Sequence, residues 1–325
     1  MKKKYSKILI TGGLGHIGAK LIRHLNPSLT DKIFILDNLE SRRFPSLYGL
    51  PRTFTYQLIR DDIVTGDMER YLTGVPVVIH LAAITDAEGS FKIAQQVEAV
   101  NFKGLQRVAD ACLKTGTKLL FPSTTSVYGS QDVRVDETCA ELKPQSPYAE
   151  TKLSSEHYLR SLKEKGLKFV ICRFGTIFGF SIGMRFDTAV NRFTWQAAHG
   201  QPLTVWKTAW KQRRPYLYLG DCIAAINFVL RNDIFDGEIY NVLTKNFTVE
   251  DVVKSIKKYY PKTKVNFVDS VMMNQLSYDV DDSKFRRLGF KPAGKLYDGI
   301  RETVAQFAGF RTIIKPAKEK YEWEK

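Results

Sequence analysis

Three side chains of the sequence could together move a proton to and from a substrate: Thr124, Tyr148 and Lys152. Side chains four residues apart lie on one face of a helix, so a helix through "SPYAETK" directs Tyr148 and Lys152 into one site. A tyrosine hydroxyl is a weak base at its usual pKa of about 10, and a nearby ammonium group lowers that pKa. Lowering it to near neutrality corresponds to about 4 kcal/mol. Thr124 could then hydrogen-bond the substrate oxygen as its charge changes. The set predicts a redox enzyme rather than a binding module.

The N-terminal segment supplies the elements that such a site requires. Residues 7–11 form a short apolar run that predicts a strand, and an amphipathic helix is expected after a turn rich in glycine. The glycines of this turn are Gly12, Gly13, Gly15 and Gly18. Glycine allows a tight turn and lets backbone amides approach a pyrophosphate, which also meets the positive end of the helix dipole. The pattern therefore predicts a dinucleotide-binding βαβ unit.

An acidic residue at the end of the next strand indicates which dinucleotide is bound. The apolar run "KIFILD" ends in Asp37, which is placed to accept hydrogen bonds from an adenosine ribose. This favours NAD over its 2′-phosphorylated relative. Arg42 and Arg43 lie just beyond and could meet a 2′-phosphate, so strictness for NAD stays open.

Over nearly its whole length the chain resembles the extended short-chain dehydrogenase/reductases of the nucleotide-sugar epimerase and dehydratase group, which includes UDP-glucose 4-epimerase. The segments "TGGLGHIG", "LDNLESRR", "RDDIVTGD", "VIHLAAITDA", "VNFKGLQRVADAC" and "FPSTTSVYG" occur in the family's order before "SPYAETK". The resemblance implies that the NAD-binding residues are Gly12, Gly15, His16, Ile17, Gly18, Asp37, Asn38, Asp62, Ile63, Leu81, Ala82, Ala83, Asn101, Tyr148 and Lys152.

The resemblance also implies a set of substrate contacts, in which several positions depart from the family's pattern. These candidates are Thr124, Thr176, Arg185, Asn191, Arg214 and Gln275. Thr176 stands where the family has an asparagine, and Gln275 and Tyr278 lie where an arginine is usual. Arginine suits a diphosphate because its planar fork donates paired hydrogen bonds. A UDP-, dTDP- or GDP-linked sugar is therefore expected, with the nucleotide open.

The leading hypothesis for the reaction is epimerisation at C4 of such a sugar. Tyr148 would take the proton of the 4-hydroxyl while hydride passes to NAD, and the same hydride would return to the other face of the 4-ketone. Dehydratases of the family carry an Asp-Glu pair after the threonine, whereas this chain has Thr125 and Ser126. A 4-reductase or 4-dehydrogenase with net cofactor turnover is the alternative, and a non-catalytic NAD-sensing or RNA-binding protein is a third.

The expected fold is α/β, a Rossmann-type doubly wound parallel sheet with a smaller C-terminal α+β substrate domain. Residues 1–178 are assigned to the NAD-binding domain with a return segment at 214–243, and residues 179–213 and 244–325 to the substrate domain. The 325 residues suffice for two such domains. The family implies a homodimer through helices that include Tyr148.

Composition narrows the remaining function classes. The net charge of +15 is spread along the chain without a basic helix carrying interleaved aromatics, so nucleic acid is not an expected partner. No apolar stretch after "MKKKYSK" is long enough for a signal peptide or a membrane span. The five histidines and four cysteines show no metal-ligand spacing, so we expect no metal site. Reduced thiols fit a cytoplasmic protein.

Overall fold

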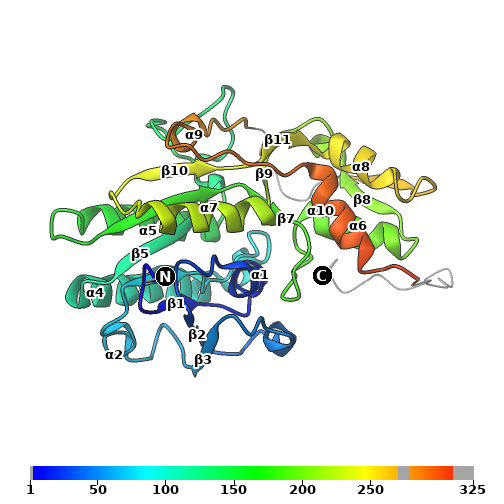
Figure 1. Ribbon diagram of the computed structural model, residues 1–325. Helices are drawn as coiled ribbons and strands as arrows, with labels where there is room; N and C mark the ends of the chain where they lie inside the picture. The colour runs from blue at the N-terminus through cyan, green and yellow to red at the C-terminus, as the bar shows by residue number, and fades with distance from the viewer. Residues whose placement is uncertain (1–2, 270–277, 310–325) are drawn as a thin grey trace.

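A seven-stranded parallel sheet is the centre of the computed structural model, which describes residues 3–269 and 278–309 (Figure 1). In chain order its strands are β1 (Ile8–Thr11), β2 (Lys32–Asp37), β3 (Thr55–Arg60), β4 (Val77–His80), β5 (Lys118–Thr124), β6 (Phe169–Phe174) and β10 (Ile239–Val242). They lie side by side in the order β10-β6-β5-β4-β1-β2-β3. The chain reverses direction across the sheet between β1 and β4, which creates the switch point where doubly wound sheets bind ligands. The predicted fold is confirmed.

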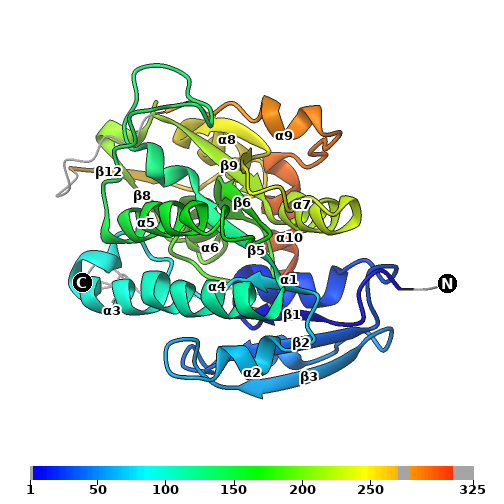
Figure 2. The same ribbon diagram turned by 90° about the vertical axis from the view of Figure 1, so that its left-hand side faces the viewer.

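Helices cover both faces of this sheet. Helices α1 (His16–His24) and α7 (Leu219–Asn232) cover one face. Helices α2 (Met68–Leu72), α4 (Gly104–Thr115) and α5 (Pro147–Ser161) cover the other, where Figure 2 shows α4 beside α5. Successive side chains of a strand point to opposite faces, so Ile8 and Ile10 pack under α1 and Leu9 packs under α2 and α4. Burial on both faces explains why these strands are continuous apolar runs.

The segment between β4 and α4 is a chain of short helical pieces. A 3₁₀ turn at Gly89–Ile93 leads into α3 (Ala94–Val97), a π-helical stretch at Glu98–Lys103, and then α4. Further 3₁₀ turns are found at Phe44–Leu47, Thr125–Tyr128 and Lys207–Ala209. π-helical stretches are rare and often mark functional positions, and this one contains Asn101.

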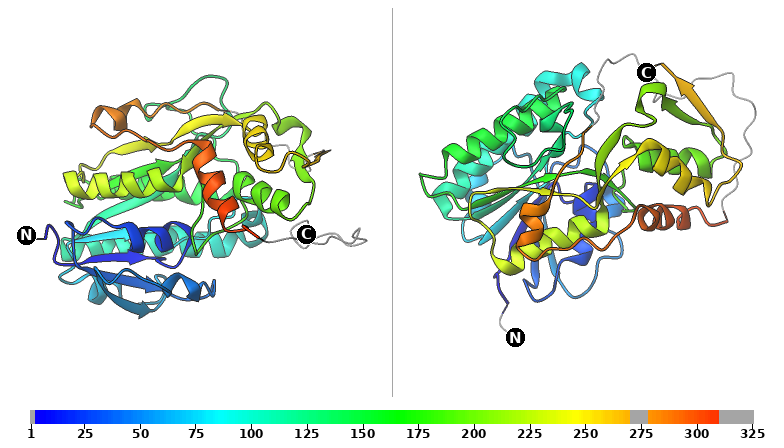
Figure 3. Two further views of the ribbon diagram at one scale, coloured as in Figure 1. Left: turned by 45° about the vertical axis from the view of Figure 1, so that its right-hand side comes forward. Right: turned by 90° about the horizontal axis from the view of Figure 1, so that it is seen from above.

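A second, smaller body lies beyond the carboxyl ends of the parallel strands (Figure 3). Its elements are β7 (Thr176–Phe178), α6 (Ala189–Ala198), β8 (Leu203–Trp206), β9 (Arg213–Tyr218), β11 (Lys245–Thr248), α8 (Val249–Lys257), β12 (Val265–Val268) and α10 (Leu296–Ala305). Strand β9 lies between β7 and β11, and β8 pairs with β12. In the part of the chain that the structure describes, the smaller body thus consists of two short sheets and three helices.

The polypeptide passes between the two bodies several times. Within the expected return segment 214–243, α7 and β10 rejoin the main sheet, while β9 belongs to the three-stranded sheet. Helix α9 (Ser283–Arg287) lies in the sequence between β12 and α10 of the small body but packs on the main one. Its Phe285 is 1% exposed and contacts the rings of Phe228 and Tyr240. The exact domain limits remain a proposal.

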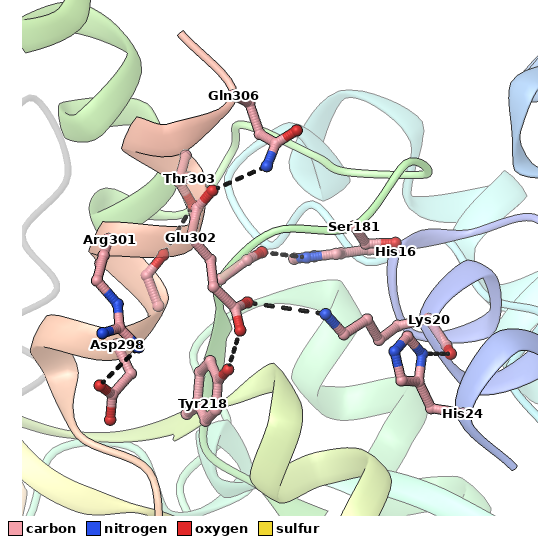
Figure 4. A network of polar contacts seen from close by, with 12 residues as sticks. His16, Lys20, His24, Ser181, Tyr218, Asp298, Arg301, Glu302, Thr303 and Gln306 are labelled. Carbon is pink, nitrogen blue, oxygen red and sulfur yellow. Dashed lines mark hydrogen bonds and ion pairs between the residues drawn. The ribbon is translucent and has the colours of Figure 1, made fainter. Parts of the chain in front are cut away.

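Polar contacts between α1 and α10 connect the two bodies (Figure 4). Glu302 of α10 accepts a hydrogen bond from the hydroxyl of Tyr218 at the end of β9. Its other carboxylate oxygen lies 3.7 Å from the ammonium of Lys20 on α1. Burial raises the pKa of Tyr218, and the Glu302 carboxylate raises it further, so the phenol stays a donor. A partly exposed ion pair contributes little by itself, and the charge-assisted hydrogen bond is the stronger contact.

The docking of α9 can be tested by truncating its buried aromatic residue. Phe285→Ala should lower the free energy of unfolding by about 3–5 kcal/mol, because it removes a buried ring and leaves a cavity. The nearby Leu288, 43% exposed, provides the control, and Leu288→Ala should change stability by less than about 0.5 kcal/mol. Urea unfolding of both variants measures the difference. Equal stabilities would show that the C-terminal segment does not stabilise the main body.

Candidate active site

The start of α5 positions the predicted acid–base pair. Ser146 is the N-cap, where its side chain accepts a hydrogen bond from the Ala149 amide at 3.2 Å, and Pro147 occupies the first helical turn. Both residue types favour a helix start at this point. Tyr148 and Lys152 then follow one turn apart and both line the large cleft between the two bodies.

Strand β5 contributes the opposite wall of this site. Thr124 is its last residue, and its hydroxyl lies 3.1 Å from the Ser126 hydroxyl and accepts a hydrogen bond from the Ser126 amide. The Lys152 ammonium donates to the Pro122 carbonyl at 2.9 Å and lies 4.5 Å from the centre of the Phe121 ring. Thr124, Ser126, Tyr148 and Lys152 all line the cleft. The structure thus brings the three predicted catalytic residues together.

The electrostatics of Tyr148 differ from the sequence-based expectation. Burial raises the pKa of Tyr148, whereas we expected Lys152 to lower it. The effects that oppose this rise come from the Arg185 guanidinium and from a hydrogen bond with Thr124. Lys152 is itself deeply buried, and burial lowers its pKa to about 7. The reason for the difference is that α5 packs closely on β5, so both groups lose hydration that the sequence pattern does not reveal.

The glycine turn fits a dinucleotide at close range. Gly12 has φ +64°, and a Cβ there would lie 2.6 Å from the Ala82 nitrogen. A Cβ on Gly18 would lie 2.6 Å from Gly13. The turn therefore has no room for side chains, which leaves its amides and the first turn of α1 facing the cleft. These features fit the pyrophosphate of NAD.

Asp37 is placed at the end of β2 and already holds two backbone groups. Its carboxylate accepts from the Leu14 amide at 3.1 Å and from the Leu39 amide at 3.0 Å. A carboxylate has about four acceptor positions, so two remain for ribose hydroxyls. Arg43, which we considered as a partner for a 2′-phosphate, donates to the Gly183 carbonyl at 3.0 Å.

The other predicted cofactor residues fall into two groups. Gly15, His16, Ile17, Leu81 and Ala83 line the cleft together with Gly12, Gly18, Tyr148 and Lys152. The second group shapes the walls through internal contacts. The Asn101 side chain accepts from the Ile84 amide and donates to the Ile84 carbonyl, both at 2.8 Å. Asn38 donates to the Asp62 carboxylate at 2.7 Å, and the Ala82 amide donates to the Thr11 hydroxyl. Ile63 packs in the core under α4.

The predicted substrate residues are also divided. Thr176, Arg185 and Arg214 line the cleft. Asn191 is 1% exposed, and its amide group bonds the Gly179 nitrogen at 3.1 Å and the Arg185 carbonyl at 3.0 Å. It therefore braces the segment that leads into α6. Gln275 lies outside the described residues.

Sequence reasoning missed several residues of the substrate side, namely Arg192, Trp206 and Tyr216, which line the cleft. The Arg192 Nε atom is buried without a hydrogen-bond partner among the described residues. A signal for Arg192 did exist, because Thr188 and Arg192 are four residues apart and a helix places them on one face.

The segment between β7 and α6 lies directly on the glycine turn. His16 bonds the Gly179 carbonyl through Nε2 at 2.9 Å. A Cβ on Gly183 would lie 2.4 Å from the Leu14 carbonyl oxygen and 2.7 Å from that of Gly15. Residues 179–185 thus pack against the glycine turn, and Arg185 at the end of this segment lines the cleft.

Within residues 3–269 and 278–309, His, Cys, Asp and Glu side chains form no cluster of three or more that could hold a metal ion. None of the helices in these ranges is both long and apolar enough to cross a bilayer.

The close packing of residues 179–185 on the glycine turn leads to a prediction about NAD binding. Gly183→Ala should weaken NAD binding by about tenfold, or about 1.4 kcal/mol, because the added methyl group displaces the glycine turn. Ile182→Ala, at a neighbouring side chain that is 44% exposed, is the matched control. Isothermal titration calorimetry with NAD checks both. Unchanged affinity in Gly183→Ala would show that the segment yields without moving the turn.

Comparisons with known proteins agree with this geometry. Residues 8–242 match the NAD dependent epimerase/dehydratase family. An uncharacterised UDP-glucose epimerase of Bacillus subtilis (strain 168) is 31% identical over 310 residues, which are 92% of this chain and 97% of that protein. The dTDP-D-glucose 4,6-dehydratase of Mus musculus is 29% identical over 92% of this chain and 87% of that protein.

Among solved structures, the UDP-glucuronic acid 4-epimerase of Bacillus cereus, in complex with UDP-glucuronic acid and NAD, superposes with a TM-score of 0.83. It is 30% identical and the match covers 93% of this chain and 99% of that one. The predicted family and the predicted NAD dependence are confirmed. The chain belongs to the NAD-dependent epimerase/dehydratase family.

Proposed function

We propose that this protein catalyses epimerisation at C4 of a nucleotide-linked sugar through a transient 4-ketone. The proposal depends on one observation: Thr124, Tyr148 and Lys152 line the same cleft, which extends from the glycine turn to the smaller body. A sugar bound there would have one ring carbon between the hydroxyls of Thr124 and Tyr148 and the part of the cleft that borders the glycine turn. The similarity to the Bacillus cereus 4-epimerase supports the choice of C4.

The chain's own residues perform the proton transfer and the positioning. Tyr148 takes the proton from the 4-hydroxyl and later returns it, and Thr124 donates a hydrogen bond to the same oxygen. Positive charge from Arg185 and a hydrogen bond with Thr124 favour the phenolate against the cost of burial. We propose that Lys152, one helical turn away and lining the same cleft, adds a second positive charge. Bound NAD supplies a reversible hydride acceptor.

The residues after Thr124 favour epimerisation over dehydration. Dehydration needs a base and an acid at neighbouring carbons, and carboxylates serve both roles in the dehydratases of the family. Here Thr125 is 1% exposed with its hydroxyl near the Phe174 carbonyl at 3.4 Å, and Ser126 presents a hydroxyl to the cleft. Neither side chain can act as a base near neutral pH.

The substrate side of the cleft is suited to a nucleoside diphosphate. Arg192 and Arg214 line it together with Trp206 and Tyr216. Guanidinium groups fit phosphate oxygens, and aromatic rings fit the face of a base or sugar. We propose a UDP-linked sugar as the first substrate to test, because the Bacillus cereus epimerase binds UDP-glucuronic acid. A dTDP- or GDP-linked sugar remains within the proposal.

Assembly and location belong to the proposal as well. We propose a cytoplasmic homodimer that forms through the surface of α4 and α5. The ring of Phe102, in the π-helical stretch just before α4, lies 6.3 Å from the ring of Tyr158 on α5. Phe91, in the 3₁₀ turn before α3, is 48% exposed. Free cysteines at positions 112, 139, 172 and 222 are consistent with a reducing compartment.

Isotopic labelling tests the reaction itself. The protein with NAD and UDP-hexoses carrying deuterium at C4 should give an epimer of unchanged mass that keeps the label, without accumulation of NADH. Product NMR and absorbance of the reduced cofactor provide the two measurements. Stoichiometric NADH with a keto-sugar would instead identify a dehydrogenase, and loss of water would identify a dehydratase.

The role of Tyr148 is tested by removing only its hydroxyl. Tyr148→Phe should lower kcat by about 10²–10⁴-fold, because the variant lacks the hydroxyl that we propose takes the substrate proton. NAD affinity should stay within about twofold of wild type, equivalent to about 0.4 kcal/mol. Tyr158→Phe on the same helix, whose hydroxyl bonds Asp110 at the surface, is the control and should keep full activity. Unchanged kcat in Tyr148→Phe would refute the assignment.

A further inference from the structure

A buried ion pair lies one helical turn beyond Lys152. Glu156 of α5 accepts from the Arg173 guanidinium of β6 at 2.6 Å and 3.0 Å, and the two side chains are 1% and 3% exposed. The Ser123 hydroxyl of β5 donates to the same carboxylate at 2.5 Å. Arg173 also lies 4.8 Å from the centre of the Tyr128 ring. The Glu156 carboxylate is therefore held from two strands of the central sheet.

Stability alone is a weak reason for this arrangement. Removing two charges from water costs several kcal/mol per ion, and apolar replacements of buried ion pairs are often neutral or stabilising. The neighbouring buried residues in or next to β5 and α5 include other polar side chains, among them Thr125, Thr151 and Ser155, but these three carry no charge. A neighbour that requires a negative charge would account for the carboxylate.

Lys152 is the neighbouring residue whose charged form the Glu156 carboxylate favours. Burial lowers the pKa of Lys152 to about 7, and the Glu156 carboxylate opposes this loss of charge. Side chains at i and i+4 lie on one helix face, and Ser123, which holds Glu156, lies between Pro122, the acceptor for Lys152, and Thr124. The same short stretch of β5 thus fixes the carboxylate, the ammonium and the catalytic hydroxyl.

Other groups around Lys152 do not replace this carboxylate. On β4, His80 is buried and its pKa is lowered to about 3 by burial and by Lys152, so it is neutral. On β5, Lys152 meets the Phe121 ring and the Pro122 carbonyl. Tyr148 precedes Lys152 by one turn of α5 and lines the same cleft. The Arg173 guanidinium of β6 is paired with Glu156.

We propose that Glu156, fixed by Arg173 and Ser123, is a positioning residue that keeps the Lys152 ammonium charged beside Tyr148 during catalysis. The proposal rests on the proposed function, since only an acid–base role of Tyr148 requires that charge. It adds the buried residues Glu156 and Arg173 to the three side chains that line the cleft. Glu156 itself touches neither substrate nor cofactor.

The first test is Glu156→Gln, which keeps the shape and removes the charge. The Lys152 pKa should fall by about one pH unit, a tenfold change in its ionisation constant. The alkaline limb of the kcat–pH profile should move to lower pH by the same amount, because the lysine loses its proton sooner. Glu156→Asp, which retains a carboxylate, should restore part of this shift. Glu238→Gln, in an exposed ion pair with Lys163, should leave the profile unchanged.

A second variant covers the case in which an unpaired Arg173 prevents folding. Glu156→Gln combined with Arg173→Gln removes both charges and leaves neutral partners. Because Glu156 is the carboxylate that acts on Lys152, the lysine pKa should still fall in this variant. Circular dichroism establishes that each variant is folded before it is titrated.

Direct titration separates failure of this proposal from failure of the proposed function. NMR of protein labelled with ¹³C at the lysine ε-carbon, with the Lys152 signal identified from Lys152→Arg, reports its pKa without any substrate. A wild-type Lys152 pKa in the folded neutral variant would overturn the role of Glu156. A wild-type protein inactive on every nucleotide sugar, with the Lys152 shift present, would instead overturn the proposed function alone.

Discussion

Parallel pairing of β1 with β4, and onward to β5 and β6, places the carboxyl ends of four strands along one edge of the sheet. The site depends on this constraint. Gly12 follows β1, His80 ends β4, Thr124 ends β5 and Phe174 ends β6, and all four line the same cleft. Helices α1 and α5, which follow β1 and β5 in the chain, start near this edge and present their first turns to the cleft.

Burial acts on the site in two opposite ways. Close packing of α5 on β5 gives Lys152 and Tyr148 fixed positions, and the same packing disfavours the charged form of each, because water is excluded. Nearby charges oppose this effect: Arg185 favours the charged form of Tyr148, and Glu156 favours the charged form of Lys152. Precise positioning and maintained ionisation therefore depend on residues outside the motif that first draws attention.

The cofactor side and the substrate side of the cleft are not independent. The segment from Gly179 to Arg185 contacts the glycine turn through the close approach of Gly183, and it is hydrogen-bonded by His16 at the start of α1 and by Arg43. It continues into α6 with Arg192. Asn191 holds both ends of this segment. A displacement of the glycine turn would therefore be transmitted to the substrate side of the cleft through the short segment 179–185.

The sequence by itself determined the family and the dinucleotide loop, and it predicted the acid–base trio, because these depend on local patterns. Glycine spacing, the apolar runs of β1 and β2, and the i, i+4 spacing of Tyr148 and Lys152 are all readable within short windows. Only the tertiary structure decided that Asn191 is a brace, that Arg192 faces the cleft, that Tyr148 has a raised pKa and that Glu156 meets Arg173. Each of these depends on which elements pack together and how much water they exclude, and neither quantity is encoded in any single stretch of the chain.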